Sequence, residues 1–101
     1  MISTDEAVKH LSKDLGIKED VLVREGIIEY LKSKIRACMR DRLEIMSRYK
    51  VSSFDEFEKK VKEGTVPEHP GWEDLITLEN LENSINKFRK ELSHVGNLSK
   101  S

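Results

Sequence analysis

Residues 78–95 read LENLENSINKFRKELSHV, and this stretch decides the fold. Its apolar side chains recur at alternating steps of three and four residues, which is the spacing of a heptad repeat along one face of an α-helix. Such a face must be covered by another helix, from the same chain or from another one. The residues that carry the repeat are Leu78, Leu81, Ile85, Phe88, Leu92 and Val95. The sequence therefore predicts a protein that works by packing helices.

A second apolar pattern runs through residues 18–49, with no proline to interrupt it. At about 1.5 Å per residue, residues 21–49 would form a helix roughly 43 Å long. Its apolar stripe is wide, which is typical of a bundle interior. We expect this stripe to exceed what the rest of the chain can cover, and therefore to form the interface of a symmetric homodimer. The expected dimer-interface residues are Ile28, Leu31, Ile35, Cys38, Ile45 and Tyr49.

Two further helices are indicated by their first residues. Ser3 with Glu6 and Ser53 with Glu56 each have the spacing of a capping box, and a glycine follows each of the two apolar patterns. The sequence thus predicts an all-α fold, a helical bundle with one long central helix that dimerisation completes. The expected helices cover residues 4–15, 18–49, 53–63 and 71–94.

At 101 residues the chain has the length of one domain. We expect a single helical domain over residues 1–95 and a flexible tail over residues 96–101. Within the domain, residues 1–49 would form a helical hairpin with the long helix, and residues 53–95 a C-terminal helical arm after a short linker. The two prolines, Pro67 and Pro70, lie inside this arm and precede its last helix.

Charge is dense but balanced, because 37% of the residues are charged and the net charge is −1. An average globular domain has about 25% charged residues. The charge is balanced over the whole chain but not within its segments: residues 1–31 carry −3, residues 32–50 carry +5 and residues 51–95 carry −4. A basic middle between acidic flanks indicates an interaction surface.

The basic segment leaves two interpretations open. Lys32, Arg36 and Arg40 share one helix face and could follow a phosphate backbone, so a nucleic-acid-associated protein is the alternative function. Only Tyr49 could stack on a base there. In the other interpretation, this face docks against acidic helices of the same chain or of a partner.

Catalytic and metal-binding residues are sparse. His69 with Glu73 is a ligand-type pair at helical spacing, and acids at a helix start are explained by the helix dipole alone. The lone cysteine falls on an apolar stripe, where it is expected to act as a small buried hydrophobe. We expect no enzyme, no cofactor and no metal. A small catalytic site near His69 is the third class of function considered.

The N-terminus is acidic and no 18-residue apolar window exists, so neither a secretory signal nor a membrane span is expected. A single cysteine cannot form an internal disulfide, which favours a reducing cytoplasm.

Residues 14–32, DLGIKEDVLVREGIIEYLK, resemble the helix–turn–helix part of ribbon-helix-helix antitoxins. That family reads DNA with a paired N-terminal strand, and only residues 1–3 precede the first helix here. DNA recognition is therefore not carried over. Residues 47–82 are similar to small archaeal proteins from toxin–antitoxin gene pairs. The resemblance implies a non-catalytic protein that wraps and blocks a cognate toxin.

The expected function is therefore a protein–protein interaction module, antitoxin-like, that binds a cognate protein through amphipathic helices. Trp72 would either close one end of the core or anchor a partner. The expected partner-binding residues are Trp72, Leu75, Leu78, Leu81, Ile85, Phe88 and Leu92.

Overall fold

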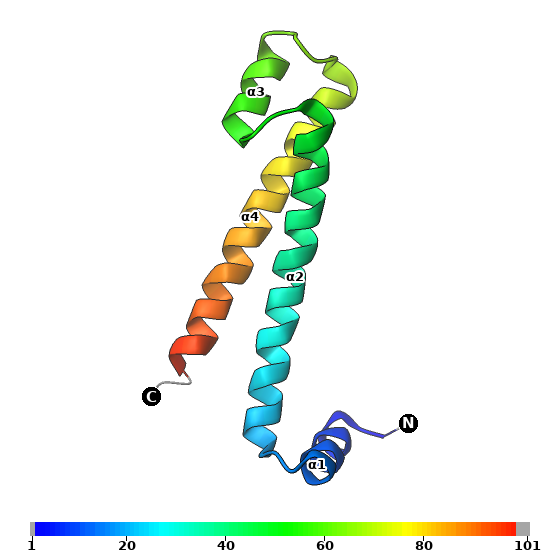
Figure 1. Cartoon of the computed structure of the whole chain (residues 1–101), viewed down its shortest axis with the longest axis vertical. Helices are drawn as coiled ribbons and strands as arrows, with labels where there is room; N and C mark the ends of the chain where they lie inside the picture. The colour runs from blue at the N-terminus through cyan, green and yellow to red at the C-terminus, as the bar shows by residue number, and fades with distance from the viewer. Residues whose placement is uncertain (1, 99–101) are drawn as a thin grey trace.

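The computed structural model describes residues 2–98, and this part of the chain contains helices and turns but no β-strand. The predicted all-α class is confirmed. The elements in chain order are α1 (Thr4–Leu15), α2 (Glu19–Tyr49), α3 (Phe54–Lys62) and α4 (Glu68–Leu98) (Figure 1).

The short helices begin and end where their local sequence predicts. The Ser3 hydroxyl accepts a hydrogen bond from the Glu6 amide at 3.1 Å, and Gly16 ends α1 in the left-handed region at φ 67°. At α3, Ser53 caps the amide of Glu56 at 3.1 Å. These bonds satisfy amides that have no partner inside the helix.

The last helix differs from the prediction at both ends. Helical structure begins at Glu68, and the backbone then leaves helical geometry at His69 and Pro70, which are joined by a cis peptide bond. The same helix continues to Leu98, so its expected end near residue 94 is wrong, whereas the flexible tail expected over residues 96–101 stays a prediction. Nothing after residue 94 stops a helix, because glycine is permissive but does not block the helical hydrogen bonds. The rest of the expected tail, residues 99–101, lies outside the described residues.

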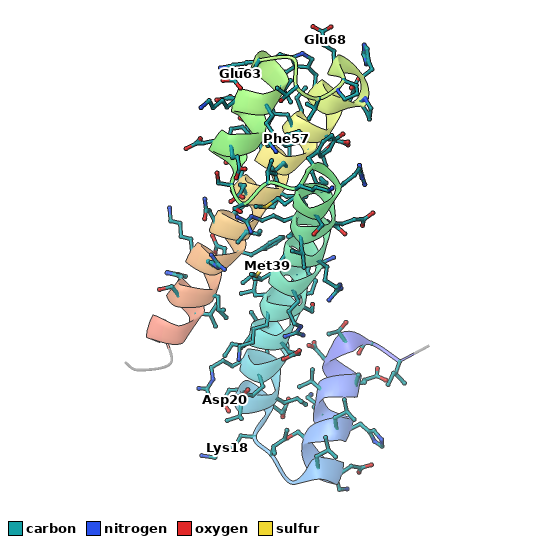
Figure 2. The ribbon with its side chains drawn as sticks, turned by 45° about the horizontal axis from the view of Figure 1, so that its top comes forward. Lys18, Asp20, Met39, Phe57, Glu63 and Glu68 are labelled. Atoms are coloured by element: carbon teal, nitrogen blue, oxygen red, sulfur yellow. The ribbon has the colours of Figure 1, made fainter. Side chains whose placement is uncertain are left out.

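The core lies at one end of the molecule. There α3 packs into the angle between the C-terminal part of α2 and the start of α4, and Phe57 lies at the centre (Figure 2). Phe57 and Leu78 are fully buried. The buried cluster consists of Ile45, Met46, Val51, Phe57, Val61, Leu75 and Leu78.

The stripe on α2 that we expected to form the dimer interface is covered within the chain by α4, which is the main neighbour of α2 (Figure 1). Leu31 is 8% exposed, Ile45 is 6% exposed, and Tyr49 packs against the core. Ile28, Ile35 and Cys38 are half-buried. The heptad face of α4 therefore packs on α2, and Leu31 and Ile45 are buried within the single chain, whereas the dimer expected on this stripe stays a prediction.

Away from the core, α2 and α4 diverge, and α1 lies beside the far end of α2 (Figure 1). The radius of gyration is 19.6 Å, against about 13 Å for a compact domain of this length. The accessible surface is 7548 Å², roughly 1,600 Å² more than a compact monomer of this mass exposes. The end of the molecule opposite the core is thus left open.

Candidate interaction surfaces

A groove of about 660 Å³ lies at the open end, between α1, the start of α2 and the last turns of α4. Its apolar lining comes from Val8 on α1, Val23 and Ile27 on α2, and Val95 on α4. The charged residues at its rim are Asp5, Lys9, Glu19, Asp20 and Arg24. Acids outnumber bases around this groove.

Apolar side chains stay exposed around this groove. Val23 and Ile27 are each 45% exposed, and Tyr30, one turn further along α2, is exposed as well. On α1, Leu11 and Leu15 are exposed, and no residue of this helix is buried. This end of the molecule therefore leaves apolar side chains of α1 and α2 exposed in and near the groove, and exposed apolar surface of this kind can mark an interaction site.

The residues predicted to bind a partner are divided by the structure. Leu75, Leu78 and Ile85 are buried inside the chain, so a partner could reach them only if α4 left α2. The half-buried members are Leu81, Phe88 and Leu92.

Trp72 is 40% exposed and stands outside the buried cluster. Ile76, one turn later on α4, is exposed too. Both lie near the start of α4, at the core end of the molecule, and so they form no part of the groove.

The basic face predicted on α2 is present, because Lys32, Arg36 and Arg40 are all exposed. Arg36 is already paired, with 2.6 Å between its Nη2 atom and Oε1 of Glu29. Within residues 2–98, Lys32 and Arg40 have no ion-pair partner. Leu43, which was not predicted to belong to this surface, lies beside it and is 65% exposed.

A polar cluster joins α2 to α4 beside the core. Arg48 Nη1 lies 3.0 Å from Oδ2 of Asp74, and the Tyr49 hydroxyl donates a hydrogen bond to the same oxygen. The Tyr49 ring stacks on Phe57 with 4.3 Å between ring centroids. The cluster therefore fixes the relative position of the two long helices.

Tyr49 makes the stability of this junction depend on pH. Burial raises the pKa of its phenol above 10.0, and the hydrogen bond to Asp74 adds to the increase. The native state thus holds this proton more tightly than the unfolded chain, so the contribution is complete below pH 10 and is lost as the pH rises through the folded pKa. We expect Tyr49→Phe to remove this part of the alkaline loss, measured by urea unfolding between about pH 8 and 12. An identical alkaline profile for the variant would contradict the assignment.

Few side chains within residues 2–98 are placed as catalytic or metal-binding groups would be. His69 Nδ1 lies 2.5 Å from Oε1 of Glu73 in an exposed pair. Residues 2–98 contain no group of three or more side chains placed to hold a metal ion. In the same part of the chain, no helix is long and apolar enough to cross a membrane.

The fold and its surfaces define an elongated all-helical protein with a core at one end and an open groove at the other. The chain belongs to the uncharacterized protein MJ0235 family, whose model matches residues 1–100. No curated protein and no solved structure matches it.

Proposed function

We propose that this protein is a non-catalytic interaction module that receives an amphipathic helix of another protein in the groove between α1, α2 and α4. One observation carries the proposal: the core is confined to one end, while apolar side chains on three helices stay exposed around a groove at the other. Covering such a surface gains roughly 25 cal/mol per Å² of apolar area.

The charge around the groove defines the chemistry of the occupant. Residues 1–31 carry a net charge of −3, and acids are in the majority at the rim. A helix with an apolar face and basic flanks would match both the lining and the rim. The antitoxin-like form of this function, in which the occupant belongs to a toxin, stays a prediction from the sequence resemblance, and the family match does not bear on it.

Two substitutions test the groove with a matched control. We expect Ile27→Glu, at its lining, to weaken binding of the partner at least about tenfold, because the apolar face of the partner helix would then cover a charged carboxylate. Ile76→Glu makes the same change at an exposed site on α4 outside the groove, and should leave binding unchanged. The partner is isolated by affinity purification from the source cells, and the purified pair is then measured by calorimetry.

Equal binding by both variants would contradict the proposal, as would the absence of any protein that the wild type retains and Ile27→Glu loses. Both substitutions are at exposed positions, so circular dichroism should show unchanged helix content.

A further inference from the structure

Four residues of α2 recur every seven positions: Leu22, Glu29, Arg36 and Leu43. They share one line along the helix, which we name the α2 seam. Leu43 is nearly on the opposite side of α2 from the core residue Ile45, because two residues are separated by about 200° around a helix. Glu29, Arg36 and Leu43 are exposed and Leu22 is half-buried. The seam is thus free of α4.

We propose that the α2 seam pairs antiparallel with the same seam of a second copy of this chain. The order Leu-Glu-Arg-Leu is self-complementary when one copy is reversed. A two-fold axis between positions 32 and 33 sets Leu22 against Leu43 of the second copy. The same axis sets Glu29 against Arg36 of the second copy. Every contact then occurs twice, as an isologous interface requires.

A flanking pair obeys the same register. Glu25 and Arg40 lie about 30° to either side of the seam, both are exposed, and reversal brings each level with the other of the second copy across the seam. Arg40 has no ion-pair partner within residues 2–98, and the antiparallel dimer supplies one. A parallel, in-register pair would instead set Glu29 against Glu29 and Arg36 against Arg36. Like charges would then repel each other at both positions.

Two features of the surface favour close approach by a second helix. A hollow of about 410 Å³ lies beside Leu43 and Met39, and in this register it is level with the N-terminal part of the other α2. Gly26 lies next to the seam, and the space where its Cβ would stand is empty to 4 Å. Packing within the chain therefore does not explain why α2 carries a glycine, which costs about 1 kcal/mol in a helix interior.

Charge also distinguishes a second copy from nucleic acid on this face. Lys32, Arg36 and Arg40 would attract phosphates, but Glu25 and Glu29 occupy the same face one to four turns away and Glu29 already binds Arg36. A uniformly negative backbone meets repulsion at the acidic half. A reversed copy of the same face sets opposite charges together at Glu29 and Arg36 on both sides of the two-fold axis.

Charge reversal tests this register. We expect wild-type protein to sediment as a dimer, and Glu25→Arg and Arg40→Glu to raise the dissociation constant at least about tenfold each, because like charges then face each other. Combining both substitutions in one chain should restore the dimer. An equimolar mixture of the two single variants should form heterodimers, since each supplies the charge that the other needs.

Disulfide trapping tests the direction of the helices. In a Cys38→Ser background, Ser33→Cys lies beside the two-fold axis and should cross-link readily. Ser47→Cys lies on the same face but roughly 43 Å from its counterpart in the antiparallel pair, so it should not. Cross-linking at both positions would indicate a parallel pair and overturn the register.

Other outcomes also overturn the proposal. These are a wild-type monomer at about 100 μM, or a dimer that neither single reversal weakens. A monomer whose affinity for a fluorescent 20-base-pair duplex falls with Arg40→Glu and rises with Glu25→Arg would assign the face to nucleic acid instead. Because Ile27 lies outside the seam, failure here leaves the groove measurements unaffected, and the reverse holds too.

Discussion

Replacing Phe57 with alanine lowers the free energy of unfolding by about 3–5 kcal/mol, which is the usual cost of removing a buried aromatic ring from a core. Phe57 is 0% exposed and stacks on Tyr49. Its ring fills the space between α3 and the two long helices, so the substitution leaves a cavity that α3 is too short to close. Such a loss is a large share of the stability of a small domain.

Phe88→Ala is the matched control for Phe57→Ala. It removes the same ring from α4 nearer the open end, where the side chain is only half-buried. We expect a loss of about 1–2 kcal/mol there, because less apolar area returns to water. Urea unfolding followed by circular dichroism at one protein concentration measures both values. Equal losses would contradict a core confined to the end with α3.

The helices were predictable because their signals are local. A cap needs only a hydroxyl three residues before an amide, so Ser3 and Ser53 place the starts of α1 and α3 from the sequence alone. The ends of α4 were harder to place. The kink at His69 and Pro70 has a local signal, because a proline disfavours helical backbone at the residue before it, whereas nothing in the spacing indicates the continuation to Leu98.

Periodicity also leaves the partner of an apolar face undetermined. The sequence places Leu31 and Ile45 on one stripe of α2, and a second chain could have covered that stripe as well as α4 does. The stripe is covered within the chain because α4 returns along α2, and that return depends on the turn after α3. The same limit applied to α4, where we assigned Leu75 and Ile85 to a partner although α2 covers them.

The groove could not be predicted, because its lining comes from distant parts of the chain. Val8 and Val95 stand near opposite ends of the sequence and meet only because α1 and the end of α4 lie beside the same part of α2. The α2 seam has the opposite property. Its heptad spacing is readable, but charged residues occupy its centre and hide it from a search for apolar repeats.

Leu78→Ala tests whether the heptad face of α4 serves the fold or a partner. Leu78 is 0% exposed and belongs to the core cluster, so we expect a loss of about 2–5 kcal/mol in the free energy of unfolding. Leu92→Ala removes the same side chain from the same face two heptads further on, where it is half-buried, and should cost less than about 1.5 kcal/mol. Both are measured by urea unfolding, at a single protein concentration because self-association would add to the apparent stability.

A face held ready for a partner would behave differently. Leu78→Ala would then cost no more than Leu92→Ala in the isolated chain, and its effect would appear only when a partner is added. The expected gradient, steep at the core end and shallow at the groove end, follows from one feature of the chain: α3 closes the angle between α2 and α4 at one end, and at the other end α1 leaves the surface open. The core and the groove thus lie at opposite ends of the same pair of helices.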